Sequence, residues 1–140
     1  MIILDTDHVV VLKYESSPQA KTLSANMAAS FEDFATTAVT IEEPMRGWLA
    51  LIHRSPDVHQ QLPGYERLVE LFDFFSRWKI VQFDRQAADE FKRLRTQKIR
   101  IGTMDLKIAA IALVHDVLLL SANLRDFRQV PCLRVENWLL

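Results

Sequence analysis

The sequence predicts an α/β fold built around a mainly parallel β-sheet of four to five strands. Short apolar runs bounded by polar residues recur along the chain, as expected for strands buried on both faces of a parallel sheet. Segments with apolar residues at helical spacing separate these runs, and this alternation is typical of α/β proteins. A length of 140 residues, with no internal repeat or low-complexity segment, predicts a single domain over residues 1–140.

Each predicted strand is short, apolar or β-branched, and ends on polar residues. The first run ends on a carboxylate, and the last one is weaker because it follows a proline. The predicted strands are Ile2–Asp5, Ala35–Val39, Lys79–Phe83, Val117–Ser121 and Cys132–Val135.

Five segments between these strands have the periodicity of amphipathic helices. Leu68, Leu71, Phe72 and Phe75 form one apolar stripe, so Phe72 and Phe75 are expected in the core. Thr103 is a candidate N-cap, because its hydroxyl can accept from a free amide at a helix start. The predicted helices are Pro18–Ala29, Ile41–His53, Pro63–Arg77, Asp84–Gln97 and Thr103–His115.

Composition excludes several classes of protein. A single cysteine, Cys132, cannot form an internal disulfide, which suits a reducing compartment. The N-terminal segment lacks the basic start of a secretory signal. The longest apolar stretch falls well short of the roughly 20 residues that cross a bilayer. We therefore expect a soluble, cytoplasmic protein with no membrane partner.

The formal charge of −1 conceals an uneven distribution of charge along the chain. Residues 1–75 carry five Lys or Arg and eleven Asp or Glu, whereas residues 76–140 carry twelve and seven. The segment Arg77–Arg100 alone holds eight basic residues. A basic face beside an acidic pocket is compatible with a nucleic-acid backbone as substrate. A solvated helix face explains the charge count equally well.

Oxygen-bearing side chains follow the predicted strands at the positions where α/β proteins bind ligands, outside the carboxyl ends of the strands. Mg²⁺ prefers such ligands, and clustered carboxylates without a cation would repel one another. The sequence therefore predicts a site for metal-assisted hydrolysis. The candidate residues are Asp5, Asp7, Glu42, Glu43, Asp105, Asn123 and Asp126.

Each main candidate also has a structural explanation. Asp5 could cap the following helix. Thr40 and Glu43 match the spacing of a capping box, and Glu42 would replace Glu43 as the functional acid if the helix register differed. Asp105 lies in the first turn of a predicted helix, where its charge would favour the helix dipole.

Two further polar residues near these acids have explanations that need no catalysis. Asp126 could pair with Arg125 or Arg128 on the surface. His8 lies next to the predicted site, and we expect it to start a helix or support the acids rather than to catalyse.

At these positions the sequence resembles the PIN-domain nucleases, and among them the VapC-type toxins of prokaryotic toxin–antitoxin modules. The matching segments occur in the order of the family and span almost the whole chain. They are ILDTD at 3–7, TIEEPMRG at 40–47, IGTMDLKIAAIAL at 101–113, LSANLRDF at 120–127 and VPCLRVENW at 130–138.

The resemblance implies a three-layer α/β/α sandwich and RNA cleavage that depends on Mg²⁺ or Mn²⁺. It assigns the metal-binding acids to Asp5, Glu43 and Asp105. Two departures stand out. Asn123 occupies the place of a fourth acid, and Pro44 replaces an aliphatic residue. Supporting roles fall to Thr6, Thr103, Ser121 and Asp126, with Asp7 and Glu42 as alternative acids.

The resemblance also implies partners, namely an RNA substrate, a small DNA-binding antitoxin and a second copy in a homodimer. Surface for such contacts is expected at Val9–Leu12 with Tyr14, and in the aromatic-rich stretch Leu71–Phe75 with Trp78 apart from the two core residues Phe72 and Phe75. Two other functions stay open. One is a PIN nuclease that processes RNA without an antitoxin, and the other is a non-catalytic PIN-like module that binds RNA or protein.

Overall fold

A computed structural model describes residues 1–14 and 16–140 and contains the predicted parallel sheet. Its five strands lie in the order β3-β2-β1-β4-β5, and every neighbouring pair is parallel. The α/β prediction is therefore confirmed. The strands are β1 (Ile2–Leu4), β2 (Phe34–Thr37), β3 (Lys79–Val81), β4 (Leu118–Leu120) and β5 (Val135–Glu136).

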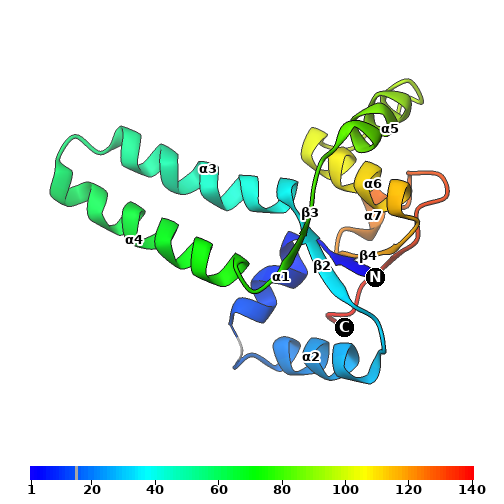
Figure 1. Cartoon of the computed structure of the whole chain (residues 1–140), viewed down its shortest axis with the longest axis horizontal. Helices are drawn as coiled ribbons and strands as arrows, with labels where there is room; N and C mark the ends of the chain where they lie inside the picture. Colours follow the sequence, from blue (N-terminus) through cyan, green and yellow to red (C-terminus); the bar gives the residue numbers. More distant parts are fainter. Residues whose placement is uncertain (15) are drawn as a thin grey trace.

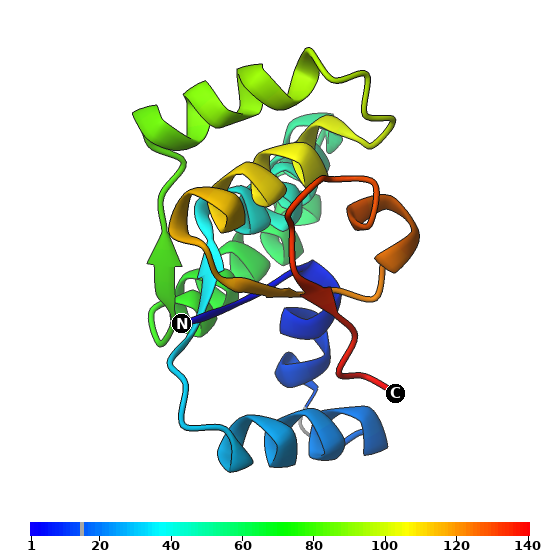
Figure 2. The same cartoon turned by 90° about the vertical axis from the view of Figure 1, so that its right-hand side faces the viewer.

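Helices cover both faces of this sheet, which gives the predicted three-layer sandwich (Figures 1 and 2). One core joins the sheet to α5, α6 and α7 through Ile3, Leu94, Ile111 and Phe127. The other joins it to α1 and α2 through Leu4, Val9 and Leu23. The helices are α1 (Thr6–Lys13), α2 (Pro18–Ala29), α3 (Ala38–Arg54), α4 (Val58–Phe75), α5 (Arg85–Arg95), α6 (Thr103–His115) and α7 (Leu124–Phe127).

The strand order places a topological switch point between β1 and β4. From β1 the chain adds β2 and β3 on one side, and then β4 and β5 on the other. Open parallel sheets bind ligands in the crevice that this change of direction leaves at the carboxyl ends of the strands. The residues that follow β1 and β4 therefore occupy the position where a site is expected.

Several predicted boundaries were wrong. A helix start near Asp5 and His8 was expected, but the bounds of α1 were not predicted, because the β-branched run Val9–Val11 favours strands over helices. The short helix α7 was not predicted. The last strand is Val135–Glu136 rather than Cys132–Val135, since Cys132 has a positive φ of 68° that breaks an extended run.

The helix after β2 begins at Ala38, three residues before the predicted start. Its N-cap is Thr37, whose hydroxyl accepts a hydrogen bond from the Thr40 amide at 3.0 Å. Thr40 therefore lies in the first turn and not at the cap, so the capping box proposed for Glu43 is wrong. Pro44 lies inside this helix, where it leaves one carbonyl without its usual amide partner.

The following helix, α4, also starts earlier than predicted, at Val58 rather than Pro63. Asp57 caps it by accepting from the His59 amide at 3.1 Å, and Pro63 lies within the second turn. Together α3 and α4 form a hairpin that extends away from the sheet (Figure 1). Gly64 allows its two helices to approach closely, since a Cβ there would lie 2.5 Å from Cγ1 of Ile52.

One face of α4 is apolar and exposed to solvent. Phe72, which was expected in the core, is 62% exposed, whereas Leu71 beside it is buried. The exposed side chains recur every three or four residues and are Val58, Leu62, Tyr65, Val69 and Phe72. No helix among the described residues combines the length and apolar character needed to cross a membrane.

Candidate active site at the carboxyl ends of β1 and β4

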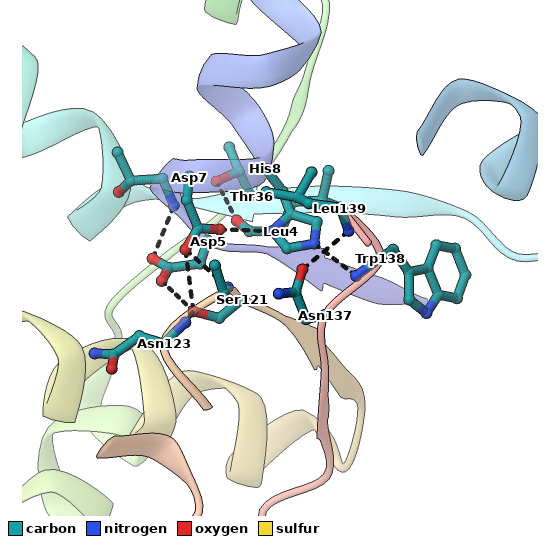
Figure 3. Close-up of polar contacts among 12 residues, drawn as sticks. Leu4, Asp5, Asp7, His8, Thr36, Ser121, Asn123, Asn137, Trp138 and Leu139 are labelled. Carbon is teal, nitrogen blue, oxygen red and sulfur yellow. Dashed lines mark hydrogen bonds and ion pairs between the residues drawn. The ribbon is translucent and has the colours of Figure 1, made fainter. Parts of the chain in front are cut away.

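Asp5 lies directly after β1 and is the buried centre of the site. It is 6% exposed, and one carboxylate oxygen accepts from the Thr6 amide at 2.8 Å as the N-cap of α1. The other oxygen accepts from the Ser121 hydroxyl, also at 2.8 Å, after β4 (Figure 3). The capping explanation of Asp5 is thus correct for one oxygen, while the second faces the switch point between the strands.

Asp7, two residues on, joins the turn after β1 to the turn after β4. One of its oxygens accepts from the Ala122 amide at 2.8 Å and lies 3.4 Å from the Ser121 hydroxyl. The other oxygen is 2.6 Å from Nδ1 of the buried His8. Its carboxylate is therefore occupied by protein donors, and this alternative acid acts as a tether in the structure.

Asn123 brings a third group of oxygens to the same edge. Its side-chain amide donates to Asp105, in the first turn of α6, at 3.2 Å and to Asp126, in α7, at 3.0 Å. The Asn123 backbone amide donates to the Ser121 hydroxyl at 3.0 Å. Asp126 thus belongs to the site, and its predicted surface pairing with Arg125 or Arg128 was wrong.

The pKa values of these acids reflect burial and crowding. Burial raises the pKa of Asp5 from 3.8 to about 6; the Asp7 charge adds to this, and Asp105 contributes a smaller repulsion. Burial also raises the pKa of Asp105, with further repulsion from Asp126 and Glu43. Asp7 differs, because hydrogen bonds from His8 and Ala122 outweigh the effect of burial and lower its pKa.

The two acids predicted in α3, Glu43 and Glu42, make no hydrogen bond to the site residues described above. Glu43 is exposed and lines a cavity of about 200 Å³ beside Thr6 and Thr40. Its charge still contributes to the raised pKa of Asp105, so the two groups are electrostatically coupled. Glu42 forms an ion pair with Arg46 on the same helix, which gives it a structural partner.

The predicted supporting residues fall into two groups. Ser121 is fully buried and contacts Asp5, and Thr6 supplies the amide that Asp5 caps. Thr103, by contrast, is exposed at the first position of α6; the N-cap is Gly102, so the predicted N-cap was wrong. Gly102 makes no side-chain cap, which leaves the amides of this helix start free of such a partner.

The donor set fits a hard divalent cation. Asp5, Asp105 and Asp126 offer carboxylate oxygens, and Asn123 carries a carbonyl oxygen beside the amide nitrogen that contacts Asp105 and Asp126; Mg²⁺ and Mn²⁺ prefer oxygen ligands. Positive charge would also offset the burial that raises the Asp5 pKa and the repulsion from Asp7 and Asp105 that adds to it. Within the described ranges, no three His, Cys, Asp or Glu side chains already form a complete metal-binding group. Mg²⁺ usually needs only one or two carboxylates, with water and substrate oxygens in the other positions.

Sequence reasoning missed how His8 and the C-terminal segment contribute to this site. His8 is fully buried, and its Nε2 accepts from the Trp138 backbone amide at 3.1 Å (Figure 3). The only signal in the sequence was a histidine next to two aspartates. A backbone donor 130 residues away leaves no trace in a local pattern.

Comparison with known proteins identifies the family. A family model described as PIN domain matches residues 2–132. The chain belongs to the PIN domain family. Its fold also resembles the crystal structure of VapBC2 from Rickettsia felis bound to a DNA fragment from their promoter. That match has a TM-score of 0.71 and 24% identity, and it covers 99% of both chains.

Curated nucleases also match part of the chain. Ribonuclease VapC2 of Haemophilus influenzae is 37% identical over 70 residues, which cover 47% of this chain and 53% of that protein. The tRNA(fMet)-specific endonuclease VapC of Salmonella typhimurium is 33% identical over 69 residues, or 46% and 52% of the two chains. The chain thus spans about half the length of the curated relatives it matches.

Proposed function

We propose that this PIN domain is a metal-dependent endoribonuclease that acts as the toxin of a toxin–antitoxin module. The observation that carries this proposal is the pair Asp5 and Asp105, whose pKa values are both raised, at the switch point of the sheet. The Ser121 hydroxyl after β4 contacts Asp5, and the Asn123 side chain before α7 contacts Asp105. The ribonuclease relatives support RNA as the substrate, and a toxin–antitoxin complex from Klebsiella pneumoniae of similar fold supports the role.

Mg²⁺ or Mn²⁺ would be held by Asp5 and Asp105, with Asn123 or Asp126 completing the set and Glu43 acting from the rim. When bound, the cation supplies charge that polarises the phosphodiester and activates water for attack on phosphorus. The side chains themselves orient the reaction. Ser121 holds one oxygen of Asp5 in place, and Asn123 fixes the spacing of Asp105 and Asp126.

The RNA backbone would be bound by cations around this acidic centre. Lys98 and Arg100 are exposed in the short segment that leads into α6, close in the chain to Asp105. Lys13 lines the cavity that also contains Glu43. Other basic residues of the 77–100 segment serve local pairs, such as Arg77 with Asp73 and Arg93 with Glu90, so they are weaker candidates.

The proposed antitoxin would cover the cavity beside Glu43. Its walls include the apolar side chains of Val9, Val10, Leu71, Phe74 and Phe75, and Thr6, the residue after Asp5, also lines it. A peptide segment with an apolar side chain in this cavity would block the route to Asp5. The exposed stripe on α4 has the spacing of a helix that packs against another helix, and we assign it to the second copy of a homodimer.

The test is RNA cleavage by the purified chain with Mn²⁺, followed by mapping of the cut sites. Asp5→Asn and Asp105→Ala should each lower the cleavage rate at least 100-fold. Asp89→Asn, on the exposed face of α5, is the matched control and should cleave like the wild type. Equal cleavage by the wild type and Asp5→Asn would exclude the proposed catalytic site.

Two outcomes would favour the other functions. Cleavage without growth arrest, and without a neighbouring gene for a small DNA-binding protein, would favour an RNA-processing nuclease. RNA binding that survives every substitution, with no cleavage, would favour a non-catalytic module.

A further inference from the structure

His8 is a fully buried polar side chain that the proposed chemistry does not use. It lies in the first turn of α1, and both of its ring nitrogens have partners in the protein. Nδ1 is 2.6 Å from an oxygen of Asp7, and Nε2 is 3.1 Å from the backbone nitrogen of Trp138 (Figure 3). The ring therefore connects the C-terminal segment to an acid of the site.

The two contacts fix the state of the ring. The Trp138 amide can only donate, so Nε2 must accept and carries no hydrogen. The hydrogen is then on Nδ1, which donates to the Asp7 carboxylate. The ring is consequently the neutral Nδ1–H tautomer, and the Trp138 amide enforces that choice.

The state of Asp7 decides where the Ser121 proton goes. The hydroxyl has one proton and two carboxylates within reach, Asp5 at 2.8 Å and Asp7 at 3.4 Å. Asp7 already receives hydrogen bonds from His8 and from the Ala122 amide. The Ser121 proton is therefore left for Asp5. Without the His8 donor, Asp7 would compete for that proton and Asp5 would lose its partner.

We propose that His8 is a positioning residue, which orients Asp7 so that the Ser121 hydroxyl is directed to Asp5. The backbone amide of Trp138 holds the ring in the required tautomer. The effect of His8 on cleavage rests on the proposed function. The arrangement of donors and acceptors that His8 sets is a property of the protein without metal or RNA.

Two substitutions separate this role from simple anchoring of the C-terminal segment. In His8→Asn the side-chain amide occupies the place of Nδ1, so it keeps a donor for Asp7 but does not reach Trp138. In His8→Gln the side-chain oxygen takes the place of Nε2, so it keeps the acceptor for Trp138 but leaves Asp7 without its donor. His59→Gln, at an exposed histidine, is the matched control.

The first measurement is amide hydrogen exchange without metal, with thermal unfolding to verify that each variant folds. His8→Gln should speed exchange of the Ala122 and Asn123 amides about tenfold, because Asp7 and Ser121 lose their fixed positions. His8→Asn should leave both near the wild-type rate and speed exchange at Trp138 instead. Ring ¹⁵N shifts of the wild type should report the neutral Nδ1–H tautomer.

The second measurement is Mn²⁺ affinity and RNA cleavage. His8→Gln should weaken Mn²⁺ binding and lower kcat about tenfold with KM little changed, while His8→Asn should retain most of both. The reverse ranking, or equal losses in the two variants, would overturn the proposal, as would an Nε2–H tautomer or a charged ring. If the wild type neither binds Mn²⁺ nor cleaves RNA, the proposed function fails, and the exchange and tautomer data still decide the role of His8.

Discussion

Asp5→Asn should stabilise the metal-free protein at neutral pH while abolishing RNA cleavage. The Asp5 carboxylate is ionised at neutral pH although it is buried beside the charge of Asp7. An amide of the same shape removes that charge and can keep both contacts, since its oxygen accepts from Thr6 and its nitrogen can donate to the Ser121 oxygen. The substitution therefore separates the stability of the fold from the function of the site.

The size of the effect follows from the pKa shift. A folded-state pKa of about 6, against an ordinary value of 3.8, corresponds to about 3 kcal/mol. The folded-state pKa is the higher one, so the penalty is absent below the unfolded value and grows as pH rises. It is complete above the folded value, and about 2 kcal/mol of it develops between pH 4.5 and 7.5.

The assay is urea denaturation of the wild type and Asp5→Asn, both free of metal, across that pH range. The difference between the two free energies of unfolding isolates Asp5, because the other titrating groups are common to both proteins. The free energy of unfolding of Asp5→Asn should increase by about 2 kcal/mol relative to that of the wild type as pH rises from 4.5 to 7.5. A difference that stays constant with pH would refute the assignment of a strained, buried charge to Asp5.

Four further predictions concern the hairpin and the site. Gly64→Ala should lower the free energy of unfolding by about 1–3 kcal/mol, because its Cβ would lie 2.5 Å from a side chain of α3. Gly47 lies inside α3, and a Cβ added there would meet nothing within 4 Å. Gly47→Ala should therefore raise the free energy of unfolding by about 0.5–1 kcal/mol, and thermal unfolding measures both glycine variants. Ser121→Ala should cost about 1–3 kcal/mol by urea denaturation and shift the pH profile of cleavage upward, because a buried carboxylate loses its donor. Asn123→Asp should lower the midpoint of thermal unfolding of the metal-free protein and increase the rise of that midpoint with Mn²⁺ concentration.

The layout of the fold could be predicted from local patterns, whereas several boundaries depended on tertiary contacts. Thr103–His115 was correct at both ends, because a continuous apolar run at 108–114 packs in the core and polar residues flank that run. The start of α3 was missed because Val39 and Thr40 are β-branched residues that favour strands. In the structure Thr37 caps the helix by accepting from the Thr40 amide, so both residues lie in its first turn. Phe72 was misplaced because periodicity identifies an apolar face without saying what covers it.

The candidate site was predictable in its residue types but less so in their roles. The rule that ligands bind at strand ends located Asp5 and Asn123, and in the structure both contact the Ser121 hydroxyl. It could not distinguish Asp5 from Asp7, since both follow the same strand. The distinction comes from the donors around them, which reach Asp7 from His8 and Ala122. Such donors are set by the folded chain and not by spacing in the sequence.

Asn123 shows how one departure from a family pattern alters the balance of charge. Its amide donates to both Asp105 and Asp126, so it holds two carboxylates together that would otherwise repel each other. An aspartate at this position has no hydrogen to donate and adds a third negative charge. Without metal, that change should lower the midpoint of thermal unfolding by several degrees and raise the pKa of Asp105 further.

With Mn²⁺ bound, Asn123→Asp should become the more stable of the two proteins, because the added carboxylate attracts the cation more strongly than an amide oxygen does. The unfolding midpoint of Asn123→Asp should therefore rise more steeply with Mn²⁺ concentration than that of the wild type. Asn123→Ala is the control, since it loses the donor without gaining charge and should be destabilised without the steeper response. Parallel responses in all three proteins would mean that residue 123 lies outside the metal site, and that the contact to Asp105 serves the fold alone.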